Sequence, residues 1–233
     1  MARVVLVHGA WHGSWCWRDL AALLEEAGHV VMCVDLPSSG AGGDLADDVA
    51  RLREVIDGID EPTVLVGHSY GGIPVTQAAA VSPVSHLVYV CAFMLDTGES
   101  LLGALGGEVP PWIEVDEPAG VSRVPDPVPV FYADVAADEA AAFRERLAPQ
   151  SLQSFADPLT AAAWHHTPST YVVCTEDRAI PAAAQQAMSA RADVVHTMAS
   201  SHSPFASQPR ELAAIIDGAS RLAGAQAEDG LAG

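Results

Sequence analysis

The chain has 233 residues and a mass of 24.3 kDa, and 50% of its residues are hydrophobic, so it can bury the core of one large domain or of one domain with an insertion. It carries 30 acidic residues against 11 basic ones, for a formal net charge of -19, and every basic residue is an arginine. This balance argues against a nucleic-acid or anionic-membrane partner, and the lack of lysine excludes Schiff-base and P-loop chemistry.

The first elements alternate between strand and helix. Residues 4–7 form a short apolar run that is typical of a buried strand, and residues 14–28 have helical spacing that ends at Gly28. Residues 29–34 predict a second strand, and residues 44–59 an amphipathic helix. Apolar strands that alternate with helices predict an α/β fold, with a mostly parallel sheet covered by helices on both faces.

A G-x-S-x-G pattern occupies residues 67–71, between an apolar strand at residues 63–66 and a helix predicted from residue 72 to residue 80. Strand, G-x-S-x-G and helix in this order are the nucleophile elbow, a sharp turn that raises the serine above the sheet. We therefore predict that Ser69 is a catalytic nucleophile and that the backbone N–H of Tyr70 binds an oxyanion. An ordinary turn serine is the alternative.

The alternation continues with a strand at residues 87–91, stops near residue 97, and resumes at residue 167. We divide the chain into a core, residues 1–96 and 167–233, and an inserted cap, residues 97–166, that covers the carboxyl edge of the sheet. The cap contains one predicted helix, at residues 136–147. A small separate core without a substrate role is the alternative. The candidate pocket residues are Gly9, Trp112, Phe131 and Trp164.

After the cap we expect strands at residues 170–174 and 194–198, with helices at residues 181–190 and 208–222. Ser207 is a plausible N-cap for the last helix, and residues 223–233 are expected to fray.

A serine hydroxyl needs a base that takes its proton and an acid that orients the base. Because ligands gather at the carboxyl ends of parallel strands, these partners should directly follow later strands. His202 and Asp177 do so, with Glu176 and Asp96 as fallback acids. The second oxyanion donor is expected after the first strand, where the N–H of Ala10 is the candidate and a plain tight turn the alternative.

We expect no metal and no cofactor. The four cysteines, at positions 16, 33, 91 and 174, match no metal or redox motif and are expected to be buried free thiols. His8 and His12 have H-x-x-x-H spacing, but glycines between and after them favour a loop over a zinc-binding helix. His68 is expected to pack beneath the elbow, and His165 and His166 to lie on the surface or in the cap.

The first predicted strand begins at residue 4, which leaves no room for a signal peptide, and no apolar run approaches the ~18 residues of a membrane helix. A cytoplasmic location is therefore expected, with no membrane partner.

Three segments carry a family resemblance: VLVHGAWHGSWCW at residues 5–17, GHSYGG at residues 67–72 and VCTEDRAIP at residues 173–181. Together they resemble the α/β-hydrolase subgroup of plant hydroxynitrile lyases, salicylate-binding methyl esterases and bacterial EstC-type esterases. The resemblance covers nearly the whole core and is poor across the cap. It implies the α/β-hydrolase fold, a catalytic triad of Ser69, Asp177 and His202, and oxyanion amides at Ala10 and Tyr70.

Two departures separate the branches of this subgroup. The lyase pattern has Thr where this chain has Gly9, and Lys directly after the catalytic histidine, where this chain has Ser203. A cyanide leaving group needs a nearby cation, so these positions favour the esterase branch.

The leading hypothesis is a serine carboxylic-ester hydrolase that acts on a small, largely apolar ester through an acyl-enzyme. One alternative is a hydroxynitrile lyase-like or biosynthetic enzyme, such as a lyase, cyclase or thioesterase, that uses the same triad. The other is a small-molecule-binding protein whose triad is idle. A homodimer is left open as the assembly.

Overall fold

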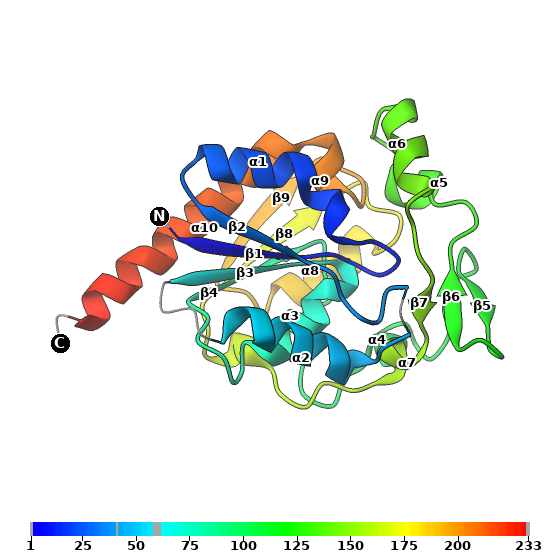
Figure 1. The fold of residues 1–233 in the computed structure, drawn as a ribbon, viewed down its shortest axis with the longest axis horizontal. Helices are drawn as coiled ribbons and strands as arrows, with labels where there is room; N and C mark the ends of the chain where they lie inside the picture. The colour runs from blue at the N-terminus through cyan, green and yellow to red at the C-terminus, as the bar shows by residue number, and fades with distance from the viewer. Residues whose placement is uncertain (1, 41, 58–61, 232–233) are drawn as a thin grey trace.

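The structure is a computed structural model that describes residues 2–40, 42–57 and 62–231. Its centre is a six-stranded parallel sheet in the order β2-β1-β3-β4-β8-β9 (Figure 1). The strands are β1 Arg3–Val7, β2 Val30–Val34, β3 Thr63–His68, β4 His86–Val90, β8 Ser169–Cys174 and β9 Val194–Met198. The sequence-based prediction of a parallel α/β sheet is confirmed.

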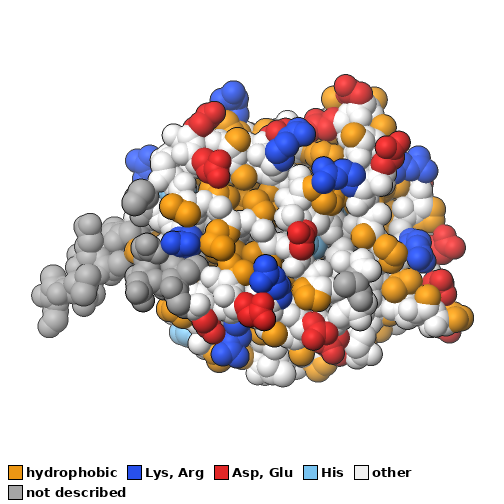
Figure 2. All heavy atoms as spheres, viewed as in Figure 1, with side chains coloured by type: hydrophobic (Ala, Val, Ile, Leu, Met, Phe, Trp, Pro, Cys, Tyr) orange, Lys and Arg blue, Asp and Glu red, His pale blue; other side chains and the backbone are white. Residues whose placement is uncertain are grey.

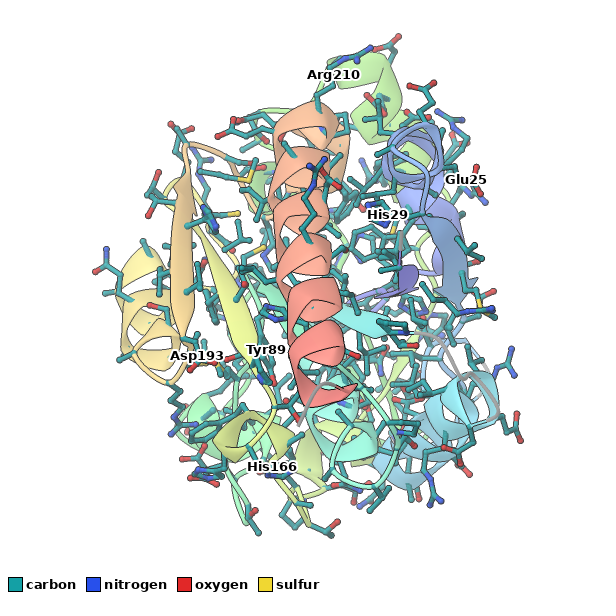
Figure 3. The ribbon with its side chains drawn as sticks, turned by 90° about the vertical axis from the view of Figure 1, so that its left-hand side faces the viewer. Glu25, His29, Tyr89, His166, Asp193 and Arg210 are labelled. Atoms are coloured by element: carbon teal, nitrogen blue, oxygen red, sulfur yellow. The ribbon has the colours of Figure 1, made fainter. Side chains whose placement is uncertain are left out.

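Helices cover both faces of this sheet. The helices on one face are α1 Arg18–Glu26, α9 Pro204–Ser207 and α10 Pro209–Leu231, and those on the other are α2 Leu45–Ile56, α3 Gly72–Ala78 and α8 Ala182–Ser189. Figure 3 shows α10 lying across its face of the sheet. None of the helices among the described residues is both long and apolar enough to cross a bilayer.

Neighbouring residues of each central strand belong to different cores. In β1, Val4 packs with the α1 and α10 side, whereas Val5 packs with the α2 and α3 side. Side chains alternate across a strand, so a strand buried on both faces must be apolar throughout. The edge strands depart from this rule, because Val30 of β2 and Val195 of β9 are exposed. Cys33 is also exposed on β2, so it is not the buried thiol that we expected, whereas the other three cysteines are buried.

Residues 97–166 connect β4 to β8, and residues 114–151 among them lie beyond the carboxyl ends of the central strands (Figure 1). They contain a small antiparallel sheet of β5 Glu114–Asp116, β6 Val121–Arg123 and β7 Gln150–Ser151. Their helices are α4 Leu101–Ala104, α5 Val128–Phe131, α6 Ala137–Arg144 and α7 Gln153–Ala156, followed by a 3-10 turn, η3 Ala163–His165. The helix predicted at residues 136–147 corresponds to α6, which is shorter.

Helix ends differ most from the predictions. Helix α2 ends at Ile56, and predicted helical residues 58–59 lie outside the described residues. Ser207 does not cap the last helix, because it ends α9 and its hydroxyl bonds to Ser200 at 3.0 Å. Pro204 and Pro209 instead begin two successive helices, where a missing N–H costs nothing. The tail that we expected to fray continues α10 to Leu231.

Candidate active site

The turn after β3 holds Ser69 in a backbone conformation that side chains rarely adopt, with a φ of 53°. The glycines of the pattern make this turn sterically possible. A Cβ at Gly71 would lie 2.5 Å from the carbonyl oxygen of His8, and one at Gly67 would lie 2.8 Å from that of Gly71. The close contact between the turn and the loop after β1 therefore depends on the absence of a side chain at Gly71, and the tightness of the turn itself depends on its absence at Gly67.

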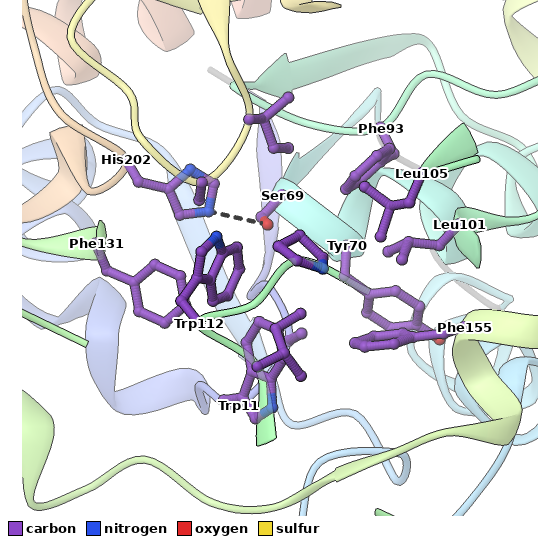
Figure 4. Close-up of a pocket in the computed structure, with 15 residues that line it drawn as sticks. Trp11, Ser69, Tyr70, Phe93, Leu101, Leu105, Trp112, Phe131, Phe155 and His202 are labelled. Carbon is purple, nitrogen blue, oxygen red and sulfur yellow. Dashed lines mark hydrogen bonds between the residues drawn. The ribbon is translucent and has the colours of Figure 1, made fainter. Parts of the chain in front are cut away.

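A chain of hydrogen bonds joins three residues that lie far apart in sequence. His202 Nε2 is 3.0 Å from Ser69 Oγ (Figure 4), and His202 Nδ1 is 2.7 Å from Asp177 Oδ2. All three side chains are buried, with His202 only 2% exposed. A proton on Nδ1 is donated to the carboxylate, which leaves Nε2 free to accept the serine proton.

The carboxylate of Asp177 is held by donors that the sequence analysis did not identify. The backbone N–H groups of Ala179 and Ile180 donate to Oδ1 at 2.7 and 2.9 Å. Gln185 Nε2 donates to Oδ2 at 2.8 Å from within helix α8. No local signal marks Gln185, since a polar residue inside an amphipathic helix is usually a solvated one.

The fallback acids lie elsewhere. Asp96 accepts a bond from the exposed His165 at 2.9 Å, which lowers the pKa of Asp96. Glu176 is exposed to solvent. Of the acids considered, Asp177 is the one that contacts the imidazole of His202.

The two candidate oxyanion residues, Ala10 and Tyr70, line the same pocket as Ser69 and His202. They come from loops after β1 and β3, which are neighbours in the sheet. The next amide along the first loop, that of Trp11, is already engaged, because it donates to Gln150 Oε1 at 3.2 Å. Ala10 and Trp11 both line the pocket, and of their two amides that of Trp11 is the one that Gln150 engages.

The pocket is walled largely by apolar side chains, and much of the wall comes from residues 97–166. Trp112 and Phe131 line it as expected, and the ring of Phe131 lies 5.5 Å from that of His202 (Figure 4). The other lining residues from this stretch are Leu101, Leu105, Pro110, Ile113 and Phe155. The site can therefore receive a small apolar molecule next to the serine hydroxyl.

Two expected pocket residues lie outside it. Trp164 lines a separate groove, where its indole N–H donates to the carbonyl of Leu95 at 2.8 Å and its ring lies beneath the guanidinium of Arg191. Gly9 lies behind the serine, because a Cβ there would come 2.7 Å from Ser69 Cβ. Its role is to permit a close backbone approach, and it does not contribute to the pocket wall.

Three other histidines surround the site in neutral form. Burial lowers the pKa of His8 and His68, and it lowers that of His12 to about 3. His68 donates from Nε2 to the carbonyl oxygen of His202 at 2.8 Å, so it supports the histidine loop from beneath the elbow. The ligand atoms of His68, Cys91 and His202 lie within 4.8 Å of one another, but both ring nitrogens of His202 already have partners.

Comparisons with known proteins bear on the family and the fold of the chain. The model of the family described as "Alpha/beta hydrolase family" matches residues 4–215. A carbendazim hydrolyzing esterase from Nocardioides sp. (strain SG-4G) is 35% identical over 183 residues, which are 70% of this chain and 74% of the relative. Methylesterase 9 from Arabidopsis thaliana is 31% identical over 91% of this chain and 95% of the relative.

A crystal structure of polyneuridine aldehyde esterase has a TM-score of 0.81 at 26% identity, covering 92% of this chain and 97% of that one. The fold of this chain thus has a counterpart in a protein that is named as an esterase.

Proposed function

The chain belongs to the alpha/beta hydrolase family, and we propose that it is a serine hydrolase that cleaves small, largely apolar carboxylic esters. The hydrogen-bonded series Ser69–His202–Asp177 beside an apolar pocket is the observation that carries this proposal. The named activities of the relatives point in the same direction.

In the proposed reaction, Ser69 Oγ attacks the ester carbonyl carbon while His202 Nε2 takes the hydroxyl proton. His202 then passes this proton to the leaving alkoxide, which departs as an alcohol. Asp177 keeps the imidazole in the tautomer that this transfer needs and stabilises its charged form. A water molecule, deprotonated by His202, then cleaves the acyl-enzyme, releases the acid and restores the serine.

We propose that the backbone N–H groups of Ala10 and Tyr70 bind the oxyanion of both tetrahedral intermediates. Their residues line the pocket beside the nucleophile and come from two loops held together by the glycine contacts of the elbow. Donors that are fixed before the reaction stabilise developing charge without reorganisation, which makes them more effective than water.

Residues 97–166 form the cap in this proposal and select the substrate. The apolar side chains of Trp112, Phe131 and Phe155 surround the space next to Ser69 (Figure 4). Such a wall favours apolar acyl or alcohol groups through burial, at about 25 cal/mol per Å² of apolar surface.

A panel of p-nitrophenyl esters of rising acyl-chain length tests this function in the wild type and in Ser69→Ala. We expect turnover of the shorter esters by the wild type, and a loss of roughly 10³-fold or more in kcat in the variant with its fold intact. A loss of only about threefold would refute the role of Ser69.

The alternatives carry less support. A lyase that releases cyanide needs a cation beside the leaving group, whereas the position after His202 is Ser203, which is buried. Thioesters and cyanohydrins assayed beside the esters separate a thioesterase or lyase from an esterase. Tight ligand binding without turnover, unchanged in Ser69→Ala, would indicate a binding protein.

A further inference from the structure

Helix α2 places a carboxylate in the interior of the protein, below the proposed oxyanion site. Asp48 is fully buried, and three donors converge on it. The backbone N–H of Ser38 donates to Oδ1 at 2.9 Å, while the Ser38 hydroxyl and the Tyr70 hydroxyl each donate to Oδ2 at 2.6 Å. The carboxylate thus ties the loop after β2 to the residue that directly follows Ser69.

The same hydrogen bonds continue into the cap and to the other oxyanion loop. Gln150 Nε2 donates to Ser38 Oγ at 2.8 Å and to Ser154 Oγ at 2.9 Å. Gln150 Oε1 accepts the backbone N–H of Trp11, the neighbour of Ala10, at 3.2 Å. A continuous path therefore runs from Trp11 through Gln150, Ser38 and Asp48 to Tyr70.

Each hydrogen bond along this path has one possible direction, because the other bonds of its two groups decide which of them donates. Ser38 Oγ accepts from Gln150 and donates to Asp48, and Tyr70 donates to the same carboxylate oxygen. Burial, followed by the adjacent charge of Asp48, raises the pKa of Tyr70, so its hydroxyl remains a donor. A fully satisfied buried network of this kind specifies one arrangement of its members, because any unpaired group in it costs free energy.

The two ends of the path are the two loops that carry the proposed oxyanion amides. Tyr70 supplies one amide from its own backbone, and Trp11 adjoins Ala10, which supplies the other. We propose that Asp48 is a positioning residue which, through Tyr70 on one side and through Ser38 and Gln150 on the other, fixes the separation of these two amides. This inference rests on the proposed function, since it concerns the same oxyanion site.

The expected consequence follows from what an oxyanion site does. Its donors bind the charge that develops in the transition state, and they contribute less to binding the neutral ester. A displaced amide therefore lowers kcat more than it raises KM. A residue that only maintains stability would lower the unfolding temperature and leave the kinetic constants of the folded enzyme unchanged.

Asp48→Asn is the direct test, because asparagine has the same shape but only one acceptor oxygen. If that oxygen faces Ser38 Oγ and Tyr70, the amide nitrogen opposes the N–H of Ser38, and two donors meet. With the amide reversed, the nitrogen faces two hydroxyls that already act as donors. The first orientation loses the bond from the N–H of Ser38 and sets two donors against each other. The second breaks the path at Asp48, since Ser38 Oγ also accepts from Gln150.

Tyr70→Phe removes only the hydroxyl and keeps the backbone amide, so it tests the same connection with less risk to folding. Tyr89→Phe is its matched control. Tyr89 is also fully buried, and its hydroxyl lies 2.7 Å from Thr76 Oγ1, but it is not among the residues that line the pocket.

The experiment measures kcat and KM for a p-nitrophenyl ester, the inhibition constant of an aryl trifluoromethyl ketone, and the unfolding temperature of each variant. The ketone forms a tetrahedral adduct with the serine and so reports on the oxyanion site. We expect Asp48→Asn and Tyr70→Phe to lower kcat by about tenfold or more, to weaken the ketone by the same factor, and to change KM by less than about threefold. Tyr89→Phe should keep wild-type kinetic constants.

Kinetic constants of Asp48→Asn and Tyr70→Phe that match those of Tyr89→Phe would overturn the inference. If Asp48→Asn does not fold, Tyr70→Phe alone decides by the same criterion. A wild-type enzyme that neither hydrolyses esters nor binds the ketone would instead refute the proposed function, and this inference with it.

Discussion

Individual histidines near the site differ in what their surroundings allow them to do. His12 lies in the interior, where Nδ1–H donates to the carbonyl of Ala10 at 2.9 Å and Nε2 accepts from the hydroxyl of Tyr132 at 2.7 Å. Both bonds need the neutral ring, since a protonated ring would have no acceptor for Tyr132. His202, by contrast, has a carboxylate beside it that stabilises the charged form.

The neutral state of His12 gives the protein a pH-dependent stability. Burial lowers its pKa from 6.5 to about 3, so the unfolded chain takes up a proton first as the pH falls. The stabilisation is complete above pH 6.5 and is lost as the pH falls from 6.5 toward 3. From pH 7 to pH 5, His12 alone should lower the free energy of unfolding by about 2 kcal/mol.

Urea unfolding at both pH values measures this change, and His12→Gln should show a smaller difference between them than the wild type. His166→Gln is the control, because His166 is exposed and its variant should keep the wild-type difference. A wild-type pH dependence in His12→Gln would contradict this assignment.

At the residue scale, the positions of Ser69, Asp177 and His202 could be predicted because the ends of parallel strands meet at one edge. The pocket residues were harder to predict. Trp112 and Trp164 both lie within residues 97–166, yet of these two only Trp112 lines the pocket beside Ser69. The sequence shows where an aromatic residue stands in the chain. The direction of its side chain depends on long-range packing, because this segment has no regular periodicity from which a face could be read.

Among the elements, the turn between β3 and α3 is the one on which the site depends most. It passes so close to the loop after β1 that a Cβ on Gly71 would lie 2.5 Å from His8 O and 2.8 Å from Val7 O. These are backbone atoms of a central strand and its loop, so they cannot move aside separately.

Gly71→Ala should therefore destabilise the protein by about 1–3 kcal/mol, because the turn must move away from the sheet. It should also lower kcat, since Ser69 moves with the turn. Gly218→Ala is the matched control, because Gly218 lies in α10 with open space around its Cβ position and should become more stable by up to about 1 kcal/mol. Thermal unfolding and ester turnover measure both effects, and equal stabilities of the two variants would argue against the close approach.

The sequence predicts which helices and strands are present better than it predicts the residues at which they begin and end. The apolar runs located all six strands of the main sheet, and the signal is continuous in the four central strands because these are buried on both faces. The N-cap of the last helix was predicted wrongly, because Ser207 resembles a cap in sequence whereas its hydroxyl bonds to Ser200. Which partner a serine hydroxyl takes, a helix N–H or another side chain, is decided by the tertiary fold.

On the scale of the whole molecule, the core and residues 97–166 are joined through backbone as well as side chains. The N–H of Ser151 donates to Ser38 O at 2.9 Å, and that of Ala148 donates to Trp11 O at 2.8 Å. The segment that lines the pocket is thus anchored to the loops that hold the proposed oxyanion amides. On the face shown in Figure 2, acidic and basic side chains are interspersed, so the excess of acidic residues forms no continuous negatively charged patch there.

The path through Asp48 could not be predicted from the sequence. Trp11 and Gln150 are 139 positions apart, and Gln150 and Ser38 are 112 apart, so no local pattern relates them. A buried polar network depends on partners that only the tertiary fold brings together. Sequence reasoning is strong where periodicity or a turn motif fixes geometry locally, and weak where distant residues must meet.

The central claim is that Ser69 is the nucleophile, and covalent labelling with a fluorophosphonate tests it most directly. Peptide mass spectrometry after brief exposure should find one adduct, on Ser69, in the wild type and none in Ser69→Ala, with much slower labelling in His202→Ala. Ester turnover by a wild-type protein whose Ser69 stays unlabelled, or whose label lies on another serine, would contradict the account.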